Sequence, residues 1–412
     1  MVSGLTMGCT VLIGQSIGQK DEKTAARTIG SALWLFVLIG LTISVLLYLF
    51  SGNVASAMNA PSEALGQTKD YIRICAVGMV FIGLFNAVCG IFRGMGDSKT
   101  PLKLMLIACI LHILGDIVLV GFFQWNSNGA AISTVVAEAS SVIFAFISIA
   151  KRGFIFPVGK KDLLPYKREI QRILLYGLPI SAQEALTGLS FMVILAILNG
   201  FGLIDSAGVG VAEKICALMF LVPGTFMSAV SAFTAQNVGA RKYGRAKSSM
   251  YCGMLCSFAV GLVVFFISFF HGDWLSGFFT MDQAVILASA DYLKSYSIDC
   301  IIVGFHFCMM GYLNGNGKTF LTSLIGILST FLIRIPFAYI MSKMEGATLF
   351  QVGFATPLAS VFAILIATVC VRSIIKQQET LDKHSHYSPL APERRILIHL
   401  SGFSLFPTIQ PH

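Results

Sequence analysis

Long apolar segments recur along the chain at the length that a lipid bilayer requires. A helix needs about 20 such residues to cross the hydrocarbon core. Continuous runs exclude the alternating pattern of a membrane barrel, and only 12% of the 412 residues are charged. We therefore expect an all-α integral membrane protein. The apolar runs lie near residues 29–50, 71–92, 101–123, 129–150, 170–200, 208–237, 250–270, 286–313, 319–342 and 350–375.

Lysine and arginine are distributed unequally between alternate loops. Loops on one side carry 18 of these residues, and loops on the other side carry two, Lys69 and Lys343. Because cytoplasmic loops are enriched in Lys and Arg, we expect the basic side and the C-terminal tail to be cytoplasmic. The net charge of +9 then reflects topology and contact with membrane lipid. It does not indicate nucleic-acid binding, since no basic patch lies in an aqueous domain.

The chain contains an internal repeat with a constant offset. Gln15 and Gly18 recur as Gln236 and Gly239, an offset of 236 − 15 = 221 positions. Each copy holds an even number of helices, so the two copies share one orientation, as in parallel-repeat transporters. Further identities at the same offset are Ala25/Ala246, Asp70/Asp291, Tyr71/Tyr292, Gly83/Gly304, Gly90/Gly311, Gly94/Gly315 and Gly96/Gly317.

Two six-helix lobes follow from this repeat. At the 221 offset, the equivalents of residues 170–200 and of most of 208–237 would precede residue 1. The pattern therefore predicts a twelve-helix plan of which about eleven helices are present, one of them partial. The predicted parts are an N-terminal lobe at 1–150, an inter-lobe linker at 151–169, a C-terminal lobe at 170–376 and a disordered tail at 377–412.

Four short motifs, in this order, resemble one transporter family. They are Gly-Gln-x-x-Gly at 14–18, Arg-Gly-x-Gly-Asp-x-Lys-x-Pro at 93–101, Tyr-Gly-x-Pro at 176–179 and Ala-Gln-x-x-Gly at 235–239. The chain up to about residue 376 resembles the MATE family of multidrug and toxic compound extrusion transporters, and its bacterial DinF-like branch most closely. The resemblance implies that the chain lacks the family's first helix and part of the second.

The same resemblance implies a function and a location. Such proteins exchange Na⁺ or H⁺ for amphiphilic or cationic drugs by rocking two lobes in a bacterial inner membrane. We accordingly expect a monomer that binds a small substrate and membrane lipid, and that needs no cofactor beyond the coupling ion.

Ionisable side chains are costly inside a bilayer, so those in the predicted spans are candidates for coupling. His112 and Asp116 share one helix face, as do Thr134 and Glu138 on the next helix. The family's corresponding helix commonly reads Asn-x-x-x-Asp, and the resemblance implies that Asp116 and Thr134 contribute to a cation site. His112 replaces the Asn, and imidazole suits protons better than Na⁺. Asn86 is a further candidate, and a purely structural polar network is the alternative.

The second lobe offers other candidates. Glu184 joins Asp116 as a candidate proton carrier, because desolvation in one transport state would favour the protonated form. Asp299 and Arg334 either neutralise each other within the membrane or take part in transport. No cysteine spacing indicates a metal site. The candidate substrate contacts, for which core packing is the alternative, are Phe191, Met192, Met219 and Phe220.

Three rival functions stay open at this point. A lipid-linked precursor flippase of the same superfamily would need a basic cleft for a pyrophosphate, and Arg334 alone is too little. An integral-membrane enzyme would be expected to place His, Asp or Glu in a polar surface loop, and the sequence shows no such cluster. A non-functional truncated remnant is the third, because family members often place a coupling Asp in the first helix.

Overall fold

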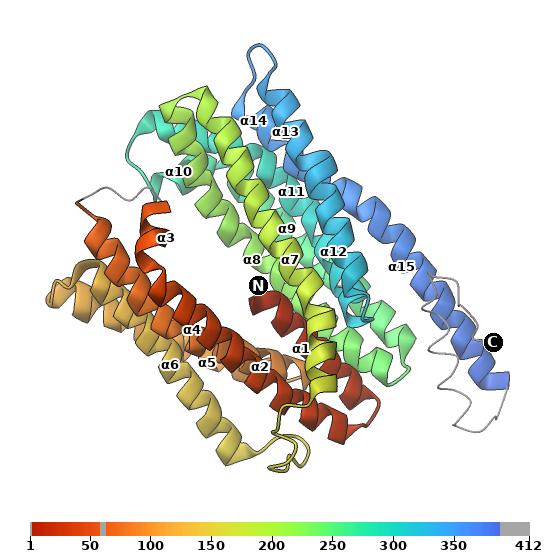
Figure 1. Cartoon of the computed structure of the whole chain (residues 1–412). Helices are drawn as coiled ribbons and strands as arrows, with labels where there is room; N and C mark the ends of the chain where they lie inside the picture. The colour runs from red at the N-terminus through yellow and green to blue at the C-terminus, as the bar shows by residue number, and fades with distance from the viewer. Residues whose placement is uncertain (1, 58–62, 388–412) are drawn as a thin grey trace, which may run out of the picture.

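The fold of this computed structural model is a helical bundle (Figure 1). The structure describes residues 2–57 and 63–387, and within these ranges it contains helices and turns but no strand. This confirms the predicted all-α fold. The segments long and apolar enough to span a membrane are Glu22–Leu49, Leu65–Gly94, Lys99–Phe122, Asn126–Lys151, Lys167–Phe201, Leu203–Gly239, Tyr243–Phe270, Gln283–Gly315, Thr319–Ser342 and Leu349–Asp382.

The first lobe is built around α4. Helices α2 and α6 pack against α4, and α5 packs against α6. Their apolar side chains form a core that includes Ile29, Phe85 and Phe92. The elements of this lobe are α1 (Val2–Gly18), α2 (Glu22–Leu49), α3 (Ser51–Ala57), α4 (Leu65–Gly94), α5 (Lys99–Asp116), the π-helical η1 (Ile117–Phe122) and α6 (Asn126–Arg152).

The second lobe is built in the same way around α11. Helices α8, α9 and α15 pack against α11, and Tyr292 and Tyr296 are buried between the elements. The elements of this lobe are α7 (Lys167–Leu198), η2 (Asn199–Phe201), α8 (Leu203–Gly239), α9 (Tyr243–Phe270), α10 (Gly272–Gly277), α11 (Gln283–Gly315), α12 (Thr319–Leu328), the π-helical η3 (Ser329–Arg334), α13 (Ile335–Ser342), α14 (Leu349–Gly353) and α15 (Ala355–Tyr387).

The helix boundaries reproduce the 221-residue offset. Helix α2 begins at Glu22 and α9 at Tyr243, and 243 − 22 is 221. Helix α1 ends at Gly18 and α8 ends at Gly239, again 221 positions apart. The two lobes therefore repeat one order of helices, and α1 corresponds to the C-terminal part of α8.

The lobes differ in which helices pack on α5 of the first lobe and on its counterpart α12 of the second lobe. In the second lobe, α7 packs on α12, η3 and α13. At the 221 offset, no described residue of the chain corresponds to α7, and α5 packs only on α4, α6 and η1 among the stronger contacts. Many apolar side chains of α5 are exposed, including Leu102, Met105 and Ile113.

Helix α2 begins at a well-formed cap. The carboxylate of Asp21 accepts a hydrogen bond from the Thr24 amide at 3.0 Å. Hydrogen bonding by Thr24 holds the pKa of Asp21 below its ordinary value, with smaller help from the nearby charges of Arg172 and Arg27. A side chain that caps the free amides of the first turn fixes where a helix starts.

The predicted start of a disordered tail after residue 376 is wrong, because the residues that follow it directly are helical. Helix α15 continues to Tyr387. Gln378 is 7% exposed, accepts a hydrogen bond from the Tyr312 hydroxyl at 2.9 Å and donates one to Asn316. These bonds tie α15 to the end of α11 at Gln378, whereas residues 388–412 of the predicted tail lie outside the described residues. The linker is also shorter than predicted, since α6 ends at Arg152 and α7 begins at Lys167.

Candidate functional site

Two glutamines join the lobes at one end of the molecule. The side-chain amide of Gln15 on α1 donates to the carbonyl oxygen of Gly315 at 3.0 Å. The side-chain amide of Gln236 on α8 donates to the carbonyl oxygen of Gly94 at 2.8 Å. Both glutamines and both glycines are partners at the 221 offset. The two bonds are therefore the two copies of one contact, crossing in opposite directions between the lobes.

Two glycines let the lobes approach each other beside these bonds. A Cβ added to Gly18 would collide with the backbone oxygen of Gln236, and a Cβ added to Gly239 would collide with that of Gln15. Only a residue without a Cβ permits so close an approach of two backbones. The repeated Gln-x-x-Gly motif thus supplies both the hydrogen bond and the space for it.

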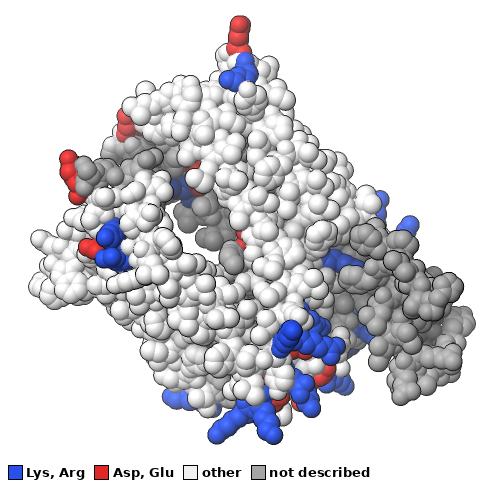
Figure 2. Space-filling model, in the orientation of Figure 1, with Lys and Arg blue, Asp and Glu red and all other residues white. Residues whose placement is uncertain are grey.

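The face between the lobes is hollowed. Figure 2 shows an open hollow in the middle of the molecule. On the face shown in this figure, most Lys and Arg side chains gather at the bottom of the view. In Figure 1, the lobes diverge from their contact around α1, and α3 and α10 lie at the far end. The lobes are therefore joined at their basic end and apart toward the other end.

The structure brings together the polar side chains predicted in the first lobe. The Nε2 atom of His112 lies 3.6 Å from Oδ2 of Asp116 and 3.0 Å from Oγ1 of Thr134. Ser133 donates to the carbonyl oxygen of His112 at 2.8 Å and so fastens α6 to α5. The side chains of His112 and Asp116 are 43% and 42% exposed. Both side chains are therefore partly exposed, and His112 connects α5 to Thr134 on α6.

Glu138 and Asn86, the two other first-lobe candidates, differ in whether they interact with this cluster. Glu138 lies within electrostatic range of His112, and its Oε2 atom is buried without a hydrogen-bond partner. The amide of Asn86 donates to the carbonyl oxygen of Ile82 on its own helix at 2.9 Å. Glu138 therefore belongs to the cluster, whereas among the described residues the hydrogen bond of Asn86 stays within its own helix.

Tyr71 is a neighbour that the sequence reasoning missed as a site residue. It lies close enough to Asp116 for their charges to interact, and it contacts Cys75 one turn along α4. Its repeat partner Tyr292 makes the corresponding contact with Tyr296, at 3.3 Å between the hydroxyl oxygens. The identity of Tyr71 and Tyr292 at the 221 offset was the signal that could have pointed to it.

Arg334 is buried inside the second lobe. Its side chain is 5% exposed and donates to the Tyr296 hydroxyl at 3.0 Å and to the Ser190 hydroxyl at 3.4 Å. The guanidinium carbon lies 3.9 Å from the centre of the Phe191 ring. A guanidinium held by hydroxyls and an aromatic face is stabilised without a carboxylate in direct contact.

The predicted direct pair between Asp299 and Arg334 does not form. Asp299 is fully buried, and neither carboxylate oxygen has a partner at hydrogen-bond geometry, although the Ser360 hydroxyl lies close enough to interact. Asp299 and Glu213 both interact electrostatically with the charge of Arg334 without contacting it directly. Glu213 is therefore a further member of this cluster, and its buried Oε1 atom has no hydrogen-bond partner.

Three of the four predicted substrate contacts pack inside the second lobe. Phe191 covers Arg334, Met219 lies 4.0 Å from the Cys300 sulfur, and the Phe220 ring packs edge-on against Tyr296. Met192 is 69% exposed. Phe191, Met219 and Phe220 stay partly exposed, so their role as substrate contacts stays a prediction.

Glu184 lies at the boundary between α1 and α7. Ser3 donates a hydrogen bond to its Oε2 atom at 2.6 Å. A Cβ on the neighbouring Gly4 would collide with Ser181, so α1 and α7 run in close contact here. Glu184 thus connects α7 to α1 through Ser3. No group of three or more metal-ligating side chains occurs among residues 2–57 and 63–387.

Comparison with known proteins agrees with this architecture. The MatE family model matches residues 1–118 and 179–340. A probable multidrug resistance protein of Bacillus subtilis, YoeA, is 23% identical over 88% of this chain and 80% of its own length. The multidrug export protein MepA of Staphylococcus aureus strain N315 is 25% identical over 87% of this chain and 80% of its own length.

Solved structures show the same fold. An outward-facing multidrug resistance MATE family transporter superposes with a TM-score of 0.86 at 21% identity, covering 92% of this chain and 85% of that one. A MOP superfamily transporter from Pyrococcus furiosus superposes with a TM-score of 0.87 over the same shares, also at 21% identity. With the family model matching more than half of the residues, the chain belongs to the MATE family of membrane transporters.

Proposed function

We propose that this protein exports amphiphilic or cationic drugs across a bacterial plasma membrane in exchange for protons. The observation that carries the proposal is the His112–Asp116 pair, 3.6 Å apart and partly exposed on α5 of the first lobe. Histidine is the side chain that titrates nearest neutral pH. The names of the relatives YoeA and MepA support the substrate class.

The chemistry of the pair favours H⁺ over Na⁺ as the coupling ion. Sodium prefers oxygen ligands, and His112 places an imidazole nitrogen beside the Asp116 carboxylate. Binding of a proton by these two groups changes the charge of the pair. The hydrogen bond with Thr134 keeps the imidazole ring oriented. In this mechanism Asp116 and His112 release a proton in one orientation of the lobes and take it up in the other.

Alternating access would follow from the contact between the lobes. With the basic end on the cytoplasmic side, the crossing bonds of Gln15 and Gln236 close the cytoplasmic entrance while the hollow opens outward. Rocking the lobes would break both bonds together, because they are copies of one contact. The C-terminal end of α15 lies on the cytoplasmic side in this orientation.

The lipid-flippase alternative draws less support. A pyrophosphate would need cationic groups in the hollow, but Arg334 is buried against Tyr296 and Phe191 inside the second lobe. Its guanidinium is therefore engaged by the protein itself.

Transport by the purified protein in liposomes tests the proposal. A proton gradient imposed without Na⁺ should drive uptake or release of a cationic dye, and Asp116→Asn should abolish this movement. Asp205→Asn, on a partly exposed carboxylate in the first turn of α8, is the matched control and should leave it unchanged. Dye movement that follows only a Na⁺ gradient, or that persists in Asp116→Asn, would overturn the proposal.

A further inference from the structure

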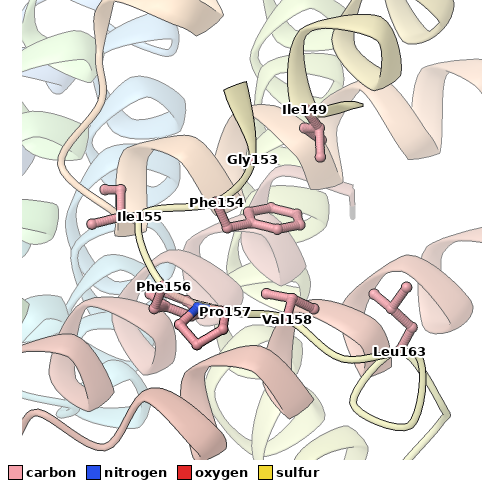
Figure 3. A pocket seen from close by; sticks show the side chains of 8 residues that line it. All are labelled: Ile149, Gly153, Phe154, Ile155, Phe156, Pro157, Val158 and Leu163. Carbon is pink, nitrogen blue, oxygen red and sulfur yellow. The ribbon is translucent and has the colours of Figure 1, made fainter. Parts of the chain in front are cut away.

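A separate pocket lies where α6 meets the connection between the lobes. Its volume is about 460 Å³, and residues 153–158 line it together with Ile149 and Leu163. Figure 3 shows Ile149 and Phe154 along one part of its wall and Val158 and Leu163 along another. Apart from the backbone, the lining is apolar.

The wall of this pocket is fixed to the first lobe. Phe156 is 6% exposed and belongs to the first-lobe core. The indole nitrogen of Trp34 donates to the carbonyl oxygen of Leu163 at 3.0 Å, and the Tyr166 amide donates to the Ser31 hydroxyl at 3.0 Å. The connection is therefore seated on α2, and the pocket is preformed.

Basic side chains border the apolar pocket. Lys151, Lys160 and Lys161 are exposed and stand within two positions of lining residues. Among the described residues, none of the three has a carboxylate partner within 4.0 Å. The adjacent carboxylate of Asp162 instead accepts from the Gly159 amide at 3.1 Å and lies 3.9 Å from Arg27. The lysines are thus available to an anion.

The pocket stands at the level where a span leaves the membrane. The span of α6 ends at Lys151, two positions before the lining residue Gly153. Nearby apolar side chains point outward, with Ile155 71% exposed and Trp34 53% exposed. Tryptophan is enriched where the hydrocarbon core meets the headgroups.

We propose that this pocket binds an anionic phospholipid. One acyl chain occupies the apolar space beside Phe154 and Val158, and Lys160 and Lys161 hold the headgroup phosphate. Charge complementarity selects an anionic headgroup, and the apolar lining requires the chain as well. This inference goes beyond drug export and does not depend on it.

Native mass spectrometry of the full chain tests the proposal. The protein is equilibrated with equal amounts of phosphatidylglycerol and phosphatidylcholine in mild detergent, and the retained lipid is weighed. We expect phosphatidylglycerol to be retained preferentially, and Lys160→Gln with Lys161→Gln to weaken its retention about tenfold. The matched control, Lys23→Gln with Lys376→Gln, removes one exposed lysine from the first turn of α2 and one from within α15 and should retain the lipid.

A second variant separates the acyl chain from the headgroup. Leu163→Trp fills the pocket while keeping the backbone bond to Trp34, and it should lower retention with all lysines present. Free glycerol 3-phosphate should not displace the lipid. Equal retention of the two lipids, equal losses in the lysine variant and its control, displacement by glycerol 3-phosphate, or full retention by Leu163→Trp would each overturn the proposal.

Discussion

The side-chain amide of Gln15 reaches across the boundary between the lobes and donates to the carbonyl oxygen of Gly315 at 3.0 Å. Its repeat partner Gln236 makes the same bond to Gly94 in the opposite direction. A repeat that related only the fold would not need identical side chains at these positions. The pairing explains why both copies hold glutamine there, since each copy supplies one donor and one acceptor.

Gln15→Ala should open the basic end more often. A hydrogen bond contributes about 0.5–1.5 kcal/mol net, so its loss should lower the ratio of closed to open molecules about fivefold. Ser16 on α1 is 4% exposed. After its replacement by cysteine, the rate at which a polar thiol reagent labels this position measures the shift. The background should lack the exposed Cys109, Cys252 and Cys256.

The control for this change is Asn237→Ala. Asn237 neighbours Gln236, but its amide donates to the carbonyl oxygen of Phe233 on its own helix at 2.8 Å. Its removal should leave the labelling rate of Ser16→Cys unchanged. Equal rates in the Gln15 and Asn237 variants would contradict the assigned role of Gln15.

Gly18→Ala should prevent the lobes from closing fully. The new methyl group would collide with the backbone oxygen of Gln236, which cannot turn aside as a side chain could. Overpacking of this kind costs about 1–3 kcal/mol, and thermal unfolding in detergent should show a lower midpoint. Gly224→Ala serves for comparison, because its added Cβ has open space, and helix propensity should leave it neutral or slightly stabilised. Equal midpoints for both variants would refute the close approach.

Most of this interface could not be read from the sequence, although the repeat itself could. The offset of 221 predicted the matching ends of α2 and α9, because identical motifs recur at the same helix termini. It did not reveal that Gln15 crosses to Gly315, since a repeat relates equivalent positions and says nothing about which different positions touch. The cluster of His112 with Thr134 was predictable, because the i, i+4 spacing of two adjacent helices set both pairs on one face.

The second-lobe cluster was predicted only in part, for two physical reasons. Arg334 closes the π-helical η3, and a wider turn rotates the residues that follow it away from the face that α-helical spacing assigns. Glu213 lies beside Lys214 in the sequence, a spacing typical of a solvated pair, yet its Oε1 atom is buried. The Phe191 ring lies against the Arg334 guanidinium, a contact between two helices that sequence spacing does not reveal.

Arg334→Met should destabilise the second lobe strongly. The change removes the bond to Tyr296 and leaves the buried Asp299 and Glu213 without a cation in range. We expect the free energy of unfolding to fall by about 2–4 kcal/mol. Adding Asp299→Asn should recover part of the loss, since it removes one buried charge. Thermal unfolding of the single and double variants measures both effects. A loss no larger than that of Arg241→Met, on an exposed arginine, would contradict this account.

Asp21→Ala should destabilise the protein in a pH-dependent way. Loss of a capping side chain costs about 1 kcal/mol, and hydrogen bonding to Thr24 lowers the pKa of Asp21 in the folded protein. Because the folded pKa is lowered, the cap contributes fully above the ordinary value of 3.8 and is lost as the pH falls through the lower folded value. Unfolding midpoints of variant and parent should therefore differ near neutral pH and converge in acid. Asp382→Ala, at an exposed site on α15, should show no such convergence.

In the proposed mechanism, the basic end of the molecule opens and closes as the lobes rock. Lys23 and Gly244 stand in the first turns of α2 and α9, both exposed and 221 positions apart, and Gly244 has open space for a side chain. Spin labels on Lys23→Cys and Gly244→Cys measure the separation of the lobes at this end in liposomes. We predict one short distance at rest and a second, longer distance when a cationic substrate is supplied and when Gln15→Ala is combined with Gln236→Ala. A single distance that stays the same under all of these conditions would contradict the account.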